Sequence, residues 1–401
     1  MSGTDARVCN SVSRAELERR WAAARSIMRD AGVDALVLQN SNDWLGGYVR
    51  WFTGAPANNA YPRSIVFPVA GPMSTVGQGP FGGVNDLDGS DALAYGVGRQ
   101  LYTPSYVSAA YTADYDADLV LSELKRLGCR SIGLVSPASM YYGFGTKLRT
   151  ELDAAGVRLA DVTGQIDGLK AIKSEEEQGL IRKTAAMQDA VLAKVRQWVR
   201  PGLKEFEVAA YAQYTGQQLG SEQGIFIGSS APAGQAAMFR PRWQQGRELR
   251  SGDTLTLLIE NNGAGGFFTE LSRPVVLGKV SQEQNDLWTA LLEAQCFTLG
   301  LLRPAASCRE IFASYNAFLR EKKMPEERRL HCHGQGYDMV ERPLVRQDES
   351  MTIAAGMCMV VHPGVKNARQ FMTIVDNYLI GPDGPGECLH RSSKSIIEID
   401  C

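Results

Sequence analysis

Two of the chain's four histidines, His331 and His333, lie in the Gly-containing segment 330–343. A third, His362, directly follows the apolar run 357–361. Imidazole has the unperturbed pKa closest to neutrality and is also a common metal ligand. Clustered histidines beside Gly-rich turns therefore predict a site for proton transfer or metal binding, while structural histidines hydrogen-bonded in turns would give the same pattern.

Two carboxylates, Glu260 and Glu270, flank a Gly-rich segment between two apolar runs. A hairpin at this point would bring both acids onto one face. Two neighbouring carboxylates either hold a cation or separate their pKa values for acid and base work. A solvated hairpin edge is the alternative, but the apolar run 255–259 directly before Glu260 favours an interior site.

The composition limits the function classes. At 401 residues the chain can form two or three domains with a large core. The net charge is −2, from 42 Lys and Arg against 44 Asp and Glu, and no basic run with interleaved aromatics suggests a nucleic-acid partner. Residues 1–7 lack the layout of a secretion signal, and no apolar stretch has membrane-spanning length. We therefore expect a cytoplasmic protein without nucleic-acid or membrane partners.

The eight cysteines are scattered and form no C-x-x-C pair, which fits reduced thiols better than disulfides or structural zinc. Cys332 lies between His331 and His333 and could act as a nucleophile. We favour a small apolar filler, because no pKa-lowering context is visible in the sequence.

The periodicity predicts an α/β domain at residues 1–166 and an α+β domain at residues 167–401. In the first, a capping box at Ser13–Glu16 opens a helix that ends at Gly32, with strands at 34–39, 64–68 and 131–135 and a helix at 119–127. In the second, a capping box at Ser174–Glu177 opens a long helix that ends before Pro201, followed by helices at 204–218 and 282–302 and strands at 254–260, 266–277, near 357, and 371–380. This order predicts a curved, mainly antiparallel sheet.

The order of these motifs resembles the creatinase, aminopeptidase P and methionine aminopeptidase family, which has the pita-bread fold. The motifs are the acidic hairpin, a His-Gly-x-Gly with a following Glu, and a Gly-Met segment leading to a His-Pro where the family has an acid before Pro. Residues 168–177 are similar to the segment that opens the catalytic domain in creatinase and aminopeptidase P. The resemblance covers nearly the whole chain, and it implies an N-terminal creatinase-type domain and a C-terminal pita-bread catalytic domain.

The chain departs from the family's metal ligands. Family peptidases bind two divalent metals through two Asp, one His and two Glu, and the resemblance places here, in order, Glu260, Glu270, His333, His362 and Val375. Val375 cannot ligate a metal, and neutral imidazole does not supply the charge of a bridging carboxylate. We therefore expect no dinuclear centre and no cofactor. A single divalent metal is the alternative, with ligands drawn from Glu260, Glu270, His333, His362 and Asp376.

Creatinase is the family's metal-free example and acts on a small guanidino acid. Its catalytic His lies in an Ala-His-Asn-Pro segment, which residues 238–241 replace here without a histidine. We therefore expect His333 to move a proton at the scissile group while Glu270 orients a water or holds developing positive charge. The supporting residues would be His331, His362, Glu341 and Glu260.

An arginine from the other subunit of creatinase holds the substrate carboxylate, and residues 61–64 resemble that place. The resemblance implies a homodimer and an anionic small-molecule substrate. A guanidinium suits bidentate carboxylate binding. The candidate substrate-binding residues are Arg63, Arg240, Arg273, Tyr61 and Phe239.

Three functions stay open. The first is a creatinase-like hydrolase that cleaves a C–N bond of a small polar carboxylate-bearing compound without a dinuclear metal centre. The second is a mononuclear metal enzyme, either a lyase resembling the family's dimethylsulfoniopropionate-cleaving members or an Xaa-Pro dipeptidase-like enzyme. The third is a non-catalytic binding protein on a peptidase scaffold. Three histidines and two glutamates at the site positions favour an enzyme, and the sequence does not name its substrate.

Overall fold

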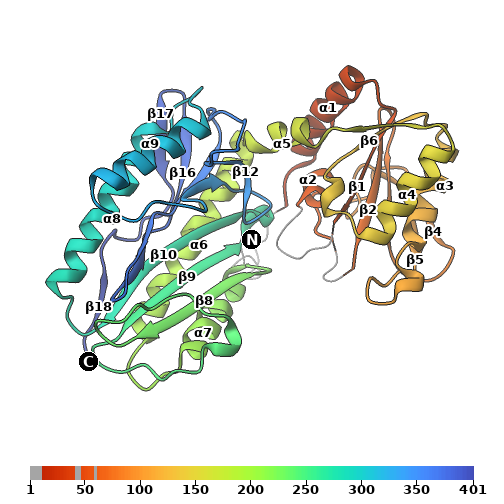
Figure 1. Cartoon of the computed structure of the whole chain (residues 1–401). Helices are drawn as coiled ribbons and strands as arrows, with labels where there is room; N and C mark the ends of the chain where they lie inside the picture. The colour runs from red at the N-terminus through yellow and green to blue at the C-terminus, as the bar shows by residue number, and fades with distance from the viewer. Residues whose placement is uncertain (1–10, 41–46, 58–60) are drawn as a thin grey trace. The chain divides into compact units, whose positions relative to one another are not determined.

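The computed structural model describes residues 11–40, 47–57 and 61–401. These residues form two compact units, 11–170 and 171–401 (Figure 1). The helix α5 (Thr163–Ala171) ends at the division between the units, so the predicted boundary at residues 166 and 167 falls inside this helix.

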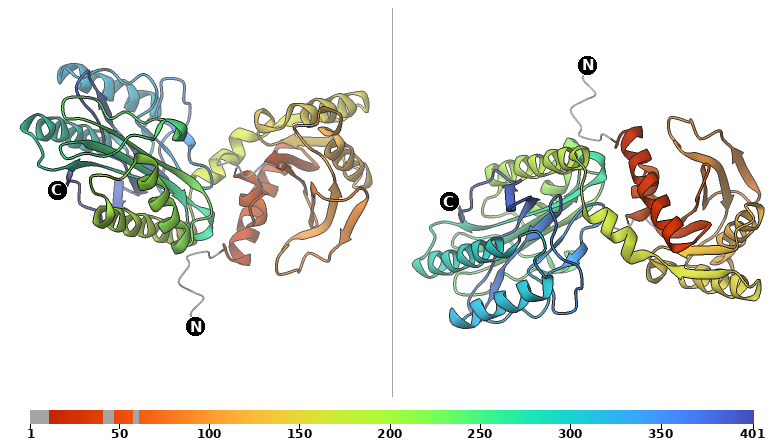
Figure 2. Two further views of the ribbon diagram at one scale, coloured as in Figure 1. Left: turned by 90° about the horizontal axis from the view of Figure 1, so that it is seen from below. Right: turned by 90° about the horizontal axis from the view of Figure 1, so that it is seen from above.

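The N-terminal unit contains a seven-stranded mixed sheet in the order β4-β5-β3-β2-β1-β6-β7. Its strands are β1 (Ala35–Asn40), β2 (Arg63–Pro68), β3 (Met73–Gln78), β4 (Gly83–Asp86), β5 (Val97–Thr103), β6 (Ser131–Leu134) and β7 (Arg158–Asp161). Its helices are α1 (Arg14–Ala31), α2 (Tyr48–Thr53), α3 (Tyr115–Arg126) and α4 (Tyr142–Ala154). The sheet lies between α1 on one side and α3 and α4 on the other (Figure 2).

Local signals set the ends of the two predicted long helices. The Ser13 side chain accepts a hydrogen bond from the Glu16 N–H at 3.1 Å, and Gly32 ends α1 with a positive φ of 63°. A complete capping box joins Ser174 and Glu177 at the start of α6 (Glu175–Trp198). Both predicted helix starts are therefore confirmed.

The C-terminal unit contains two main sheets. The first has the order β18-β10-β9-β8, with β8 (Gly224–Ala231), β9 (Thr254–Asn262), β10 (Phe268–Leu277) and β18 (Ile397–Ile399). The second has the order β12-β11-β13-β16-β17, with β11 (Cys332–Gly334), β12 (Glu341–Leu344), β13 (Cys358–Val361), β16 (Asp376–Gly381) and β17 (Gly384–Cys388). A small pair, β14 (Gly364–Lys366) and β15 (Phe371–Thr373), completes the unit. In the described residues every pairing of these strands is antiparallel except that of β10 with β18.

Helices cover one face of each main sheet and leave the other face for the site. The helices α6 and α7 (Glu205–Leu219) pack on the first sheet through buried aliphatic side chains, and α8 (Gln282–Leu301) and α9 (Cys308–Glu321) pack on the second (Figure 1). Between the uncovered faces lies a small apolar cluster of Leu258, Val360 and Val375. A bridge between Ser272 and Val375 joins the two sheets.

Two details differ from the prediction or extend it. The strand predicted at 371–380 is two strands, β15 and β16, because Ile374 and Val375 leave the β14 pairing and cross to the second sheet. In the parts of the chain that the structure describes, no helix is both long and apolar enough to cross a membrane.

Candidate active site

The two carboxylates predicted from the Gly-rich hairpin lie directly opposite each other. The register of β9 and β10 pairs Glu260 with Glu270, and paired residues of an antiparallel ladder project to the same face. Both residues are buried, with 7% and 8% exposure. Their strands are fixed on the far face by Leu257, Ile259 and Leu271, which pack against α6 and α7.

Burial and mutual repulsion change the acidity of this pair. Burial, followed by the negative charge of Glu270, raises the pKa of Glu260 well above its ordinary value. Burial also raises the pKa of Glu270, to about 7. Two carboxyl groups this close cannot both ionise at neutral pH. The pair therefore holds a proton near neutrality and can both donate and accept one.

His333 faces the carboxylate pair from β11. Its Nε2 atom lies 3.7 Å from the Glu270 Oε2 atom, and its ring centroid lies 5.1 Å from that of His362. The Nδ1 atom is 2.8 Å from the carbonyl oxygen of Gly334, which can only accept, so Nδ1 carries the hydrogen and Nε2 presents a lone pair to Glu270. Burial lowers the pKa of His333 to about 4, which makes this imidazole neutral at pH 7.

The other two predicted histidines differ in their surroundings. Burial and the neighbouring His333 lower the pKa of His362 well below its ordinary value. His331 is fully buried and its ring stacks on Tyr315 of α9, with centroids 3.6 Å apart. Neither ring nitrogen of His331 has a hydrogen-bond partner among the described residues. The ring of His331 is therefore a packing element, and its carbonyl oxygen accepts the His362 N–H at 2.9 Å. Its supporting role in catalysis stays a prediction.

Glu341 has structural partners. Its Oε2 atom accepts a hydrogen bond from the Lys173 ammonium at 2.8 Å, and its Oε1 atom accepts the Tyr337 N–H at 2.8 Å. The pair with Lys173 is almost fully buried. Glu341 thus holds the loop between β11 and β12, and its supporting role in catalysis stays a prediction.

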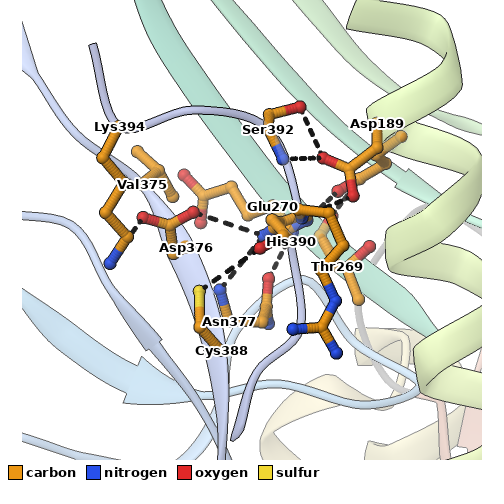
Figure 3. Close-up of polar contacts among 12 residues, drawn as sticks. Asp189, Thr269, Glu270, Val375, Asp376, Asn377, Cys388, His390, Ser392 and Lys394 are labelled. Carbon is orange, nitrogen blue, oxygen red and sulfur yellow. Dashed lines mark hydrogen bonds and ion pairs between the residues drawn. The ribbon is translucent and has the colours of Figure 1, made fainter.

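Arg273 and Asp376 are paired with each other and turned away from the carboxylate pair. The Arg273 guanidinium donates to Asp376 at 2.6 Å, and both side chains have 0% exposure. Figure 3 shows Asp376 between Lys394 and His390. Because side chains alternate along a strand, Val375 projects toward Leu258 and Val360 while Asp376 projects to the opposite side. The observed pairing occupies both side chains with each other, and the substrate role of Arg273 and the ligand role of Asp376 stay predictions that these contacts do not support.

His390, the fourth histidine, was not selected from the sequence. Its Nε2 atom lies 3.0 Å from the Gln188 side-chain oxygen. Its Nδ1 atom lies 3.7 Å from Asp376 (Figure 3). Burial lowers its pKa to about 4. Its position after β17, outside any motif, gave no signal for this contact.

The predicted aromatic and arginine residues occupy different environments. Phe239 packs beside the cluster of Leu258, Val360 and Val375, and its ring lies 5.3 Å from that of Phe371, so it lines the site region. The backbone N–H of Arg240 donates to Ser229 at 3.0 Å. Arg240 is half-buried.

Arg63 and Tyr61 belong to the N-terminal unit. The Arg63 guanidinium donates to the carbonyl oxygen of Pro56 at 3.3 Å, and burial lowers its pKa. The Tyr61 ring lies 6.3 Å from that of Tyr106. The substrate role of these two residues stays a prediction.

An exposed arginine that was not predicted acts on the site. Arg329 lies in the segment before β11, where its backbone N–H donates to Glu327 at 2.6 Å. Among the described residues its guanidinium has no hydrogen-bond or ion-pair partner. Its positive charge lowers the pKa of each of four site groups, namely Glu260, Glu270, His333 and His362.

Two amide side chains that were also not predicted connect the carboxylates. The Glu270 N–H donates to Asn377 at 2.8 Å, and Asn377 donates to Gln335 at 2.7 Å. Gln335 in turn donates to the Glu260 Oε1 atom at 3.0 Å.

Cys332 is not part of the site, because burial raises the pKa of its thiol well above the ordinary value, which agrees with the role of filler.

The donor set does not fit a dinuclear metal centre. The fifth ligand position is the apolar Val375, and the neighbouring Asp376 is fully paired on the other side of the strand. Across the described residues, no group of three or more His, Cys, Asp or Glu is arranged to hold a metal ion. We therefore assign no metal ligands and derive no chemical step through a metal.

Residues 179–382 match the profile of metallopeptidase family M24. The chain belongs to this family. An Xaa-Pro dipeptidase of Pyrococcus horikoshii is 24% identical over 335 residues, which cover 79% of this chain and 90% of that protein. A creatinase of a Bacillus species is 28% identical over 221 residues, which cover 51% of this chain and 52% of that protein.

Solved structures show the same fold. The dipeptidase PepE of Mycobacterium ulcerans superposes with a TM-score of 0.75 at 21% identity, over 98% of this chain and 100% of that one. The prolidase of P. horikoshii has a TM-score of 0.71 at 18% identity, over 94% of this chain and 100% of that one. The expected resemblance to the creatinase and aminopeptidase P family and the α+β pita-bread fold with an N-terminal domain are confirmed, and the chain is a hydrolase of family M24.

Proposed function

We propose that the chain is a creatinase-like hydrolase that cleaves a C–N bond of a small, polar, carboxylate-bearing compound without a dinuclear metal centre. The observation that carries this proposal is the buried, cross-strand pair Glu260 and Glu270 facing the neutral imidazole of His333. Such a pair supplies an acid and a base at neutral pH without a metal-bound water.

The pair accounts for hydrolysis with balanced proton transfers. Glu270 as carboxylate takes a proton from water while the water oxygen bonds to the carbon of the scissile C–N bond. The C–N bond breaks, and the leaving nitrogen takes the proton of Glu260. The products are a C–OH and an N–H group, and passage of one proton from Glu270 to Glu260 restores the starting state.

His333 has a different task from the one expected from the sequence. With a pKa lowered to about 4, its imidazole is a weaker base at pH 7 than Glu270, whose pKa is about 7. Its Nε2 lone pair instead accepts a hydrogen bond from the water or from protonated Glu270. We therefore assign the base to Glu270 and the orientation of the water to His333.

The free guanidinium of Arg329 supports an anionic substrate. An exposed Arg without a side-chain partner, whose charge reaches the four site groups, suits bidentate binding of a carboxylate.

The proposal also includes a homodimer in which Arg63 of one subunit contributes to substrate binding in the other. A monomer of full activity in light scattering would contradict that part.

An Xaa-Pro dipeptidase-like enzyme with one metal is the second candidate. It is favoured by the similarity to the P. horikoshii Xaa-Pro dipeptidase, which extends over 90% of that protein. The full chain should be assayed on guanidino acids such as creatine, on N-substituted amino acids and on Xaa-Pro dipeptides, with metal content measured by elemental analysis.

Hydrolysis of a non-peptide carboxylate that survives a chelator supports the first candidate. Cleavage of Xaa-Pro dipeptides that is lost with a chelator and restored by one equivalent of metal would overturn it and establish the second.

A further inference from the structure

Two buried amides connect the two members of the carboxylate pair. Asn377 of β16 and Gln335, directly after β11, both have 0% exposure. The chain of contacts runs from the Glu270 N–H to Asn377 Oδ1, from Asn377 Nδ2 to Gln335 Oε1, and from Gln335 Nε2 to Glu260 Oε1. The distances are 2.8, 2.7 and 3.0 Å. Neither residue is used in the hydrolysis described above.

Backbone groups at both ends fix the orientation of the two amides. The Glu270 N–H can only donate, so Asn377 must offer it the carbonyl oxygen and turn its NH₂ group to Gln335. Gln335 must then offer its own carbonyl oxygen to Asn377. Its NH₂ group donates to the Met339 carbonyl oxygen at 2.9 Å, which can only accept, and to Glu260 Oε1. No flipped arrangement satisfies both backbone groups.

We propose that Asn377 and Gln335 are positioning residues that hold Oε1 of Glu260 and leave Oε2 as the oxygen through which Glu260 acts. The inference rests on the proposed hydrolase function. A carboxylic acid that accepts a hydrogen bond through one oxygen carries its proton on the other. The amide chain therefore selects which oxygen of Glu260 presents the proton to the leaving nitrogen, and the same Asn377 holds the backbone of Glu270.

Asn377→Asp tests this selection with almost no change in shape. The substituted side chain still accepts the Glu270 N–H but can no longer donate to Gln335. Gln335 can meet the new carboxylate only by turning its NH₂ group away from Met339 and Glu260. Glu260 Oε1 then loses the hydrogen bond that holds it, and the oxygen that carries the proton is no longer selected. We expect kcat to fall roughly 10²- to 10⁴-fold, the usual contribution of a positioned acid, with KM within about threefold.

Asn316→Asp is the matched control. Asn316 is also buried, its Oδ1 accepts a backbone N–H at 2.8 Å, and its Nδ2 donates to a carbonyl oxygen at 3.1 Å, both of Glu327. This variant should leave kcat unchanged. Gln335→Met, which keeps the shape and removes the amide, should reproduce the loss seen in N377D. Full kcat in folded Q335M or N377D would overturn the proposal.

A measurement without substrate separates this inference from the proposed function. In ¹⁵N-labelled full-length protein, the side-chain NH₂ signal of Gln335 is identified by its disappearance in Q335M. It should shift in E260Q and N377D and stay in place in N316D. An unshifted signal in either site variant would overturn the inference. If the signals shift but the protein hydrolyses none of the C–N compounds, the proposed function is contradicted and the role of the amides in orienting Glu260 is still supported.

Discussion

Replacing Glu270 with Gln should change how the stability of the C-terminal unit depends on pH. In the folded chain burial raises the pKa of Glu270 from 4.5 to about 7. Between these two pH values the folded state holds a proton that the unfolded chain has released. The stability linked to this group is therefore fully present below pH 4.5 and is lost as the pH rises through 7. A pKa change of this size corresponds to about 3 kcal/mol.

The assay is chemical denaturation of wild type and E270Q at pH about 5.5 and about 8.5. Relative to wild type, E270Q should gain at least about 2 kcal/mol of unfolding free energy between these conditions, because about 1.5 of the pKa units lie in the window. Loss of the Glu270 charge also removes the part of the Glu260 pKa shift that this charge causes, which acts in the same direction. Glu349→Gln is the control. Arg342 and two backbone N–H groups bind Glu349, and its pKa is lowered to about 2, so it stays ionised throughout the window. An E270Q difference that is the same at both pH values within about 0.5 kcal/mol would refute the assignment of Glu270 as a carboxyl group of raised pKa.

Three further substitutions address other parts of the site. His333→Ala should lower kcat roughly 10²-fold or more in a folded protein, and kcat within about threefold of wild type would remove His333 from the mechanism. Arg329→Gln should raise KM for carboxylate substrates roughly 10-fold or more while its exposed neighbour variant Arg328→Gln does not, and equal kinetics of the two variants would argue against carboxylate binding by Arg329. Arg273→Met should lower the unfolding free energy by about 3 kcal/mol, because it leaves the buried Asp376 carboxylate without its closest partner, and denaturation curves matching wild type would contradict this.

The carboxylate pair could be predicted because its signal is local. The apolar run before Glu260, the Gly-rich turn and the acid at Glu270 are close in sequence, and a hairpin allows only a few registers. His333 was predicted from its scarcity and its Gly-rich flank. The elements that carry these residues were also visible as hydrophobic runs of strand length.

The remaining site residues depend on contacts between distant strands. Gln335 and Asn377 meet only because β11, β13 and β16 are neighbours, with His333 paired to Val360 and Val360 paired to Asn377. Amides of this kind occur throughout the sequence, and composition does not distinguish them. In the sequence Arg329 is likewise one of many arginines in polar segments. Only the fold shows that its charge lies near enough to affect the four site groups. The stacking of the His331 ring on Tyr315 could not be predicted, because sequence spacing does not show which side chain α9 supplies.

The alternation of Val375 and Asp376 has a consequence for assigning metal dependence among proteins of this fold. An acid is present in this part of the chain, so counting acidic residues would suggest that a ligand has merely shifted by one position. Val375, however, is held by an isolated bridge to Ser272 directly before β16, and a shift of one residue along extended backbone sends the side chain to the opposite face. Whether an acid at this point can serve as a ligand therefore depends on which of two neighbouring positions it occupies, because the two side chains point to opposite faces even when the backbone is unchanged.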